Sequence, residues 1–208
     1  MSKPTKSKKL EIADLLQPWM HKNTPAGLFA VIFSIMRAIP SFGEGVDLSN
    51  DSQRLTITSN FTLIVSYITA AKGCLTNEIK NFIKKVQIPW MDGLTTEAGL
   101  DGLIEKGSNM SETEFDFYVE QECSLLGGKV KKYLLYWALC FSGIDGLNTE
   151  EIVRFLRVGR HMGVSEKILN NLLLMYFNEC NLYKSFEDNI ISDDINDHDS
   201  NYKLQSKM

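Results

Sequence analysis

The sequence predicts an all-α protein, and three observations lead to this prediction. Apolar residues recur every three or four positions in most segments, as they do on one face of a helix. Ser111 and Asn148 each precede a glutamate by three residues, which is the pattern of a capped helix start. The one strand-like run, RLTIT at 54–58, has no second strand to pair with, so we interpret residues 41–59 as a loop.

Each expected helix is bounded by residues that start or stop helices. Pro18 ends or kinks the first one, and the second begins with Thr24-Pro25 and closes before Pro40. Gly73 and Thr76 separate the third and fourth helices, and Gly163 and Ser165 separate the last two. We therefore expect a compact bundle of eight or nine helices, near residues 10–20, 25–38, 60–72, 77–87, 96–105, 112–126, 129–142, 149–162 and 166–186.

Composition places the chain among ordinary globular proteins. Its 208 residues are 44% hydrophobic and 23% charged, which suits one domain with a real core. We expect a single helical domain over 10–186, a basic disordered tail over 1–9 and an acidic flexible tail over 187–208. Most aromatic residues within the helices, Phe177 among them, are expected in the core.

Several classes of function are disfavoured by charge and hydropathy. The net charge of −4 argues against a nucleic-acid footprint over the whole domain. No apolar stretch precedes residue 26, so no signal peptide is expected, and the apolar runs fall short of the ~20 residues that span a bilayer. Four scattered cysteines without a C-x-x-C pattern are expected to be reduced thiols, and we expect a cytoplasmic protein.

A segment of the chain is repeated. Residues 60–86 align with residues 133–159 at an offset of 73, and both read apolar helix, glycine turn, polar cap and amphipathic helix. The matching pairs are Gly73 and Gly146, Thr76 and Thr149, Glu78 and Glu151, Ile79 and Ile152, and Phe82 and Phe155. We therefore expect two similar helical hairpins whose apolar first helices pack together at the centre of the bundle.

The second copy resembles a known family. Residues 133–172 contain an apolar helix, Asp145-Gly146, Asn148, Glu150-Glu151 and then Gly163-Val164-Ser165. This order is similar to that of the TerB-like family, named for tellurite resistance, and residues 60–86 form a degenerate copy. The resemblance implies an all-helical fold with paired hairpins and a divalent cation bound by acidic turn residues. The first copy departs from it, with Lys72 at the place of Asp145 and Cys74 at the place of Leu147.

The candidate metal ligands are therefore Asp145, Glu150 and Glu151, because carboxylates are the ligands that hard divalent cations prefer. The same acids also suit the first turn of a helix, where the helix dipole favours them, so a purely structural role stays open. The spacing does not match an EF-hand, which needs a glutamate where Ile152 stands. His161 is expected at a helix C-terminus in a structural or surface role.

No catalytic residue is indicated. The sequence SLLGGKVKK lacks the first glycine and the Ser or Thr of a phosphate-binding loop, and no nucleophile motif occurs. Three functions remain open: a TerB-like, non-enzymatic binding or scaffold module in stress tolerance, with a metal-responsive acidic turn and a protein partner; a regulatory interaction domain of unrelated function; and an enzyme without a recognisable motif.

Overall fold

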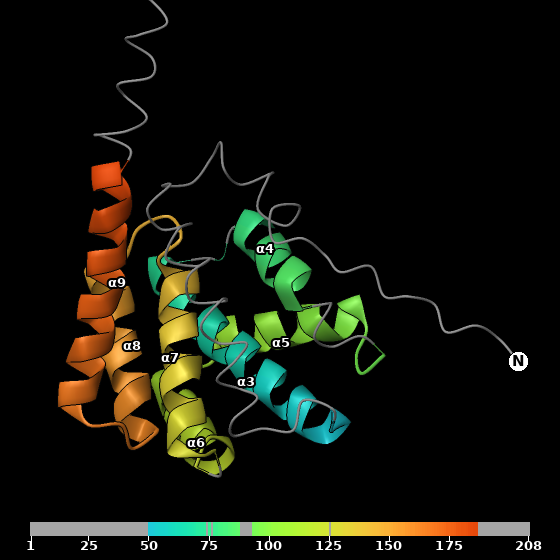
Figure 1. Cartoon of the computed structure of the whole chain (residues 1–208). Coiled ribbons are helices and arrows are strands. Elements are labelled where there is room, and N and C mark those ends of the chain that lie inside the picture. Colours follow the sequence, from blue (N-terminus) through green and yellow to red (C-terminus); the bar gives the residue numbers. More distant parts are fainter. Residues whose placement is uncertain (1–49, 74, 76, 88–92, 125, 187–208) are drawn as a thin grey trace, which may run out of the picture.

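The structure is a computed structural model, and it describes residues 50–73, 75, 77–87, 93–124 and 126–186. In this part every regular element is a helix and no strand occurs, so the predicted all-α class is confirmed for it. The elements, labelled as in Figure 1, are α3 (Asp51–Thr69), η1 (Ala70–Lys72), α4 (Asn77–Gln87), α5 (Glu97–Asn109), α6 (Glu112–Glu122), α7 (Gly128–Ser142), α8 (Thr149–His161) and α9 (Glu166–Phe186). The helices expected near 10–20 and 25–38, the cap Thr76 and both tails lie outside the described residues.

The helices form two groups that meet along α3 and α7. Helices α7, α8 and α9 contact one another at one side of the molecule, and α5 packs across α3 at the other (Figure 1). Helix α6 packs on α8, and α4 packs on α5 and α3. None of the helices in the described part is long and apolar enough to cross a membrane.

The centre of the core is a cluster of stacked aromatic rings from α3, α6 and α7. Phe61 of α3 stacks on Trp137 of α7 with ring centroids 4.3 Å apart, and Phe141 of α7 meets the edge of Phe61 at 5.1 Å. Tyr67 stacks on Phe115 of α6 at 3.7 Å. Such pairs contribute about 0.5–1.5 kcal/mol each beyond the burial of their surface. These contacts fix how α3 packs against α6 and α7.

The loop predicted for residues 41–59 is wrong over 51–59, which form the first two turns of α3; residues 41–49 lie outside the described part. Asn50 caps this helix, its side-chain oxygen accepting from the backbone N–H groups of Ser52 at 3.0 Å and Gln53 at 3.2 Å. Thr56 and Thr58 then donate their hydroxyls to carbonyls four residues back, at 2.8 and 2.6 Å. These local bonds give the threonine hydroxyls partners within the helix. Threonine is β-branched, so the sequence alone favours a strand or loop for this segment.

Gly107 was expected just beyond the end of a helix near residue 105, but it lies inside α5, which runs to Asn109. A Cβ atom at this position would lie 2.7 Å from the carbonyl oxygen of Leu63 and 3.0 Å from the Cβ of Ser66. The glycine therefore allows α5 to approach α3 closely. Helix propensity alone disfavours glycine here, and this tertiary contact overrides it.

Most other boundaries agree with the sequence. Helix α4 covers residues 77–87 as expected, α9 ends at Phe186, and the capping boxes of Ser111 with Glu114 and of Asn148 with Glu151 are both formed. Helix α6 ends at Glu122 instead of near residue 126. Gly163 has a φ of +74°, a conformation that glycine adopts without strain, which explains why α8 ends there.

Candidate functional site

The acidic turn between α7 and α8 is held in one conformation by local bonds. Gly146 has a φ of +93°, which an L side chain rarely adopts. Asn148 accepts from the backbone N–H of Glu151 at 2.8 Å, and the Glu151 carboxylate accepts from the backbone N–H of Asn148 at 3.0 Å. Asp145 and Glu151 are thereby placed on the same side of the turn, facing the end of η1.

Lys72, the last residue of η1, lies between these two acids. Its ammonium donates to the Asp145 carboxylate, to the Gly146 carbonyl oxygen at 3.0 Å, and lies 3.3 Å from Oε2 of Glu151. The Glu151 side chain is fully buried, whereas Lys72 is 23% exposed and Asp145 38% exposed. Three oxygens therefore converge on one cationic group, as they would on a bound cation.

Glu151 is a buried carboxyl with one unsatisfied oxygen. Its Oε1 atom is inaccessible to water and has no hydrogen-bond partner among the described residues. Burial raises the pKa of this carboxyl from 4.5 to about 7, against the opposing effects of the Asn148 N–H and the Lys72 ammonium. Near neutral pH the group therefore carries a proton for part of the time, and a proton on Oε1 would lack an acceptor there.

Two contacts at this site join residues that occupy equivalent positions of the sequence repeat. Thr69 donates to the hydroxyl of Ser142 at 3.2 Å, and both members of the pair are buried and 73 residues apart. Lys72 and Asp145 are also 73 residues apart. The two glycines that follow them share a positive φ, +106° at Gly73 and +93° at Gly146. The ends of α3 with η1 and of α7 therefore meet at equivalent residues.

The predicted metal ligands are only partly brought together. Asp145 and Glu151 share the ammonium of Lys72, while Glu150 is exposed and makes no hydrogen bond or ion pair with the described residues. Among the described side chains, no group of three or more His, Cys, Asp or Glu is arranged to hold a metal ion. The sequence shows Lys72 at the place of Asp145, but the direct contact between these two positions becomes visible only in the structure.

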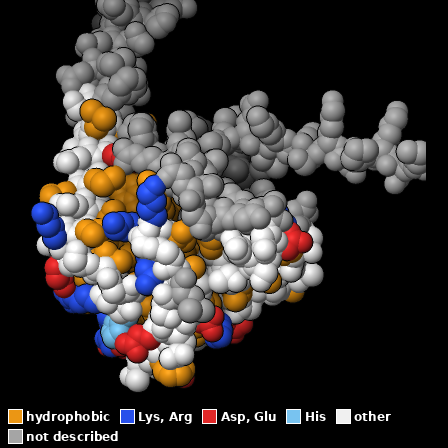
Figure 2. Space-filling view, turned by 60° about the horizontal axis from the view of Figure 1, so that its bottom comes forward, with side chains coloured by type: hydrophobic (Ala, Val, Ile, Leu, Met, Phe, Trp, Pro, Cys, Tyr) orange, Lys and Arg blue, Asp and Glu red, His pale blue; other side chains and the backbone are white. Residues whose placement is uncertain are grey.

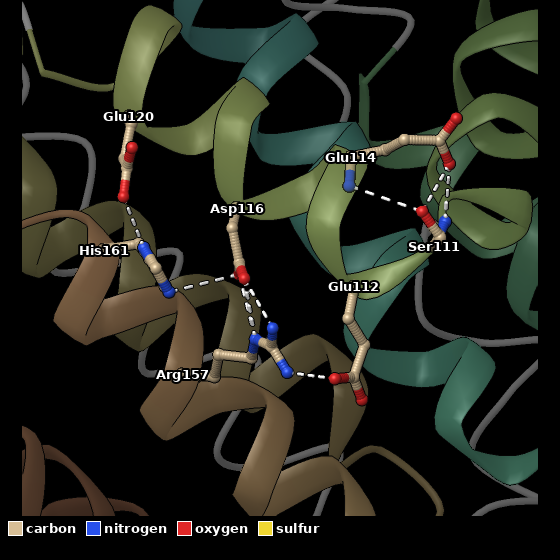
Figure 3. A network of polar contacts seen from close by, with 7 residues as sticks. All are labelled: Ser111, Glu112, Glu114, Asp116, Glu120, Arg157 and His161. Carbon is tan, nitrogen blue, oxygen red and sulfur yellow. Dashed lines mark hydrogen bonds and ion pairs between the residues drawn. The ribbon is translucent and has the colours of Figure 1, made fainter.

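A second polar cluster joins α6 to α8, and sequence reasoning missed it (Figure 3). Arg157 donates from Nε to both oxygens of Asp116, at 2.9 and 3.2 Å, and also pairs with Glu112. His161 lies between two carboxylates, 2.8 Å from Glu120 and 3.3 Å from Asp116. The guanidinium of Arg157 holds the pKa of Asp116 below its usual value.

The spacing of charged residues along α6 and α8 is the sequence feature that could have predicted this cluster. Acids recur every four residues on α6, at 112, 116 and 120, and bases occur four residues apart on α8, at 157 and 161. Two such stripes lie on single helix faces and can pair when the helices pack. His161 stands in the last turn of α8, as expected. Its contacts are those of a helix–helix joint.

Comparisons with known proteins identify no relative: no family model, no curated protein and no solved structure matches this chain.

Proposed function

We propose that this chain is a non-enzymatic helical binding module of the TerB-like type, a scaffold in stress tolerance that recruits a protein partner. In this proposal the chain consists of two similar helical hairpins, and the acidic turn is the joint between them. Lys72 supplies the positive charge that the turn requires. The contacts Thr69–Ser142 and Lys72–Asp145, each between equivalent residues of the repeat, support this reading.

The observation that carries partner binding is the apolar surface of α9. Leu174 and Leu182 are 59% and 63% exposed, and Met175 and Phe177 are 38% and 41% exposed. Phe177 was expected in the core, and this prediction is wrong. Figure 2 shows a face of the molecule on which hydrophobic side chains reach the surface among basic ones. Large exposed apolar side chains at helical spacing are typical of protein interaction surfaces.

A groove beside these residues provides room for an apolar side chain of the partner, which we call its anchor. It lies between α7 and α9, has a volume of about 280 Å³, and is lined by Lys129, Lys132, Tyr133, Tyr136, Leu172 and Met175. This volume accommodates one or two large apolar side chains. Lys132, which is exposed in this groove, favours a partner segment that carries an acidic residue beside its apolar anchor.

Site-specific photo-crosslinking in the native host tests this proposal. A benzoylphenylalanine at Leu174 or Leu182 of the full chain is expected to give one discrete protein adduct. The same group at Glu150, which is exposed on α8, serves as the matched control and is expected to give none. Equal adducts at all three positions, or none at Leu174 and Leu182, would contradict partner binding through α9.

Divalent cation binding at the acidic turn is the second candidate function, with Asp145, Glu150 and Glu151 as ligands. The buried Oε1 of Glu151 favours it, because this oxygen has no hydrogen-bond partner in the described part of the chain and an unsatisfied carboxylate oxygen is a natural cation ligand. An ion at this place would displace the Lys72 ammonium from Asp145. Titration of the metal-free chain with divalent ions, followed by thermal unfolding, tests this second candidate.

A further inference from the structure

A cavity lies beside α4 and α5, and its lining includes no residue of the turn between α7 and α8 or of α9. It has a volume of about 570 Å³ and lies between η1, α4 and α5. We call it the α4–α5 pocket; its lining includes the apolar residues Ala70, Leu75 and Ile104 and the polar residues Asn77, Lys80, Asn81, Glu105, Ser108 and Asn109. Cavities of about 300–1,000 Å³ with an apolar base and a few polar groups are typical small-molecule sites.

One lysine of this pocket already forms ion pairs with carboxylates of the protein. Lys84 of α4 lies 3.0 Å from Asp101 and 3.3 Å from Glu97, both on α5. The Lys84 side chain is only 14% exposed because it packs into this ion pair. The hydrogen bond that Lys84 donates to the Asp101 carboxylate raises the pKa of Lys84. The positive charge of Lys84 is therefore already balanced by the carboxylates of Asp101 and Glu97.

A second lysine and a second glutamate line the same pocket without forming an ion pair with each other. Lys80 lies one helical turn before Lys84 on α4, and Glu105 lies one turn after Asp101 on α5. Both line the pocket, yet among the described residues neither of them makes a hydrogen bond or an ion pair. The pocket thus presents one positive and one negative group, from opposite helices, that do not neutralise each other.

We propose that the α4–α5 pocket binds a small zwitterion, a free amino acid or short peptide, whose carboxylate faces Lys80 and whose ammonium faces Glu105. A simple anion would meet Glu105 and Asp101, and a simple cation would meet Lys80, so a ligand with both charges fits best. The amides of Asn77, Asn81 and Asn109 can donate to and accept from the ligand's remaining polar atoms. This site is independent of partner binding through α9.

Thermal unfolding of the full chain, with a panel of free amino acids and dipeptides at millimolar concentration, tests this proposal. At least one member is expected to raise the unfolding midpoint, because a ligand that binds only the folded state stabilises it. Comparison of the amino-acid and dipeptide arms identifies which of the two is the ligand. Derivatives of the hit with an acetylated amine or an amidated carboxylate are expected to lose the effect.

Charge-neutral variants then locate the site. Lys80→Gln and Glu105→Gln are each expected to weaken the hit's affinity at least about tenfold, since each removes one charged contact. Lys85→Gln on α4 and Glu122→Gln on α6, both at exposed positions outside the pocket, are the matched controls and are expected to bind as the native chain does. The proposal is overturned if no member of the panel shifts the midpoint, or if Lys80→Gln and Glu105→Gln bind as tightly as the controls.

Discussion

Replacing Glu151 by glutamine is expected to remove a pH dependence from the stability of the protein. The folded state raises the pKa of this carboxyl from 4.5 to about 7, so between these values the folded chain keeps a proton that the unfolded chain loses. The stability that this group contributes is therefore fully present below about pH 4.5 and is lost as the pH rises through 7.

The size of the effect follows from the same values. At about 1.36 kcal/mol per pH unit, the difference between 4.5 and 7 corresponds to about 3 kcal/mol. Because the turn opens to water at Asp145, which is 38% exposed, solvent screening reduces our expectation to about 2 kcal/mol. The native chain should lose this amount relative to Glu151→Gln between acid and slightly alkaline pH.

Urea unfolding of both proteins at a series of pH values measures this difference. Glu150→Gln is the matched control, because Glu150 is the exposed neighbour of Glu151 and its replacement should leave the native pH dependence in place. Stability curves of native chain and Glu151→Gln that run parallel from acid to alkaline pH would refute the reasoning. They would show that the Glu151 carboxyl has the same pKa in the folded and the unfolded chain.

Three further predictions concern packing, the α6–α8 joint and capping. Gly107→Ala should destabilise the fold by about 1–3 kcal/mol, because the added Cβ would collide with the Leu63 carbonyl oxygen. Gly102→Ala on the same helix is the control: its Cβ would have no atom within 4 Å, so thermal unfolding should show a gain in stability of up to about 1 kcal/mol. Arg157 lowers the pKa of Asp116, so the ionised carboxylate stabilises the fold at neutral pH and this stability is lost as the pH falls. Asp116→Asn should remove this contribution. If acid unfolding begins at the same pH in the native chain and in Asp116→Asn, the prediction is wrong. Asn148→Ala should cost about 1 kcal/mol in urea unfolding through loss of the α8 cap, and an unchanged midpoint would contradict this.

The sequence predicts the helical class and most helix starts well, the start of α3 excepted, because these depend on local chemistry. A side chain such as Asn148 satisfies backbone N–H groups within its own first turn, so its role is visible from three or four neighbouring residues. Gly163 ends α8 for an equally local reason, a positive φ. Such signals need no knowledge of the tertiary fold.

Two differences from the sequence prediction, at Gly107 and at the acidic turn, arise where a distant residue decides the outcome. Gly107 stays helical because α5 must approach α3, and nothing near residue 107 in the sequence reveals that contact. At the acidic turn, the repeat shows that Lys72 and Asp145 are equivalent, but equivalence does not imply contact. The structure adds that Lys72 contacts both Asp145 and Glu151, two of the three acids predicted as metal ligands.

The central claim is that Lys72 supplies the cation of the acidic turn, and metal titration of the unfolding midpoint tests it most directly. The full chain, stripped of metal, is unfolded thermally with calcium, magnesium, manganese or zinc, beside the double variant Asp145→Asn/Glu151→Gln. We predict the same midpoint for the native chain with and without each ion, because the Lys72 ammonium already binds Asp145 and Gly146. A divalent ion that raises the native midpoint, by up to about 2.7 kcal/mol of stability at 100 times its Kd, and has no effect on the double variant would contradict the claim and establish the turn as a metal site.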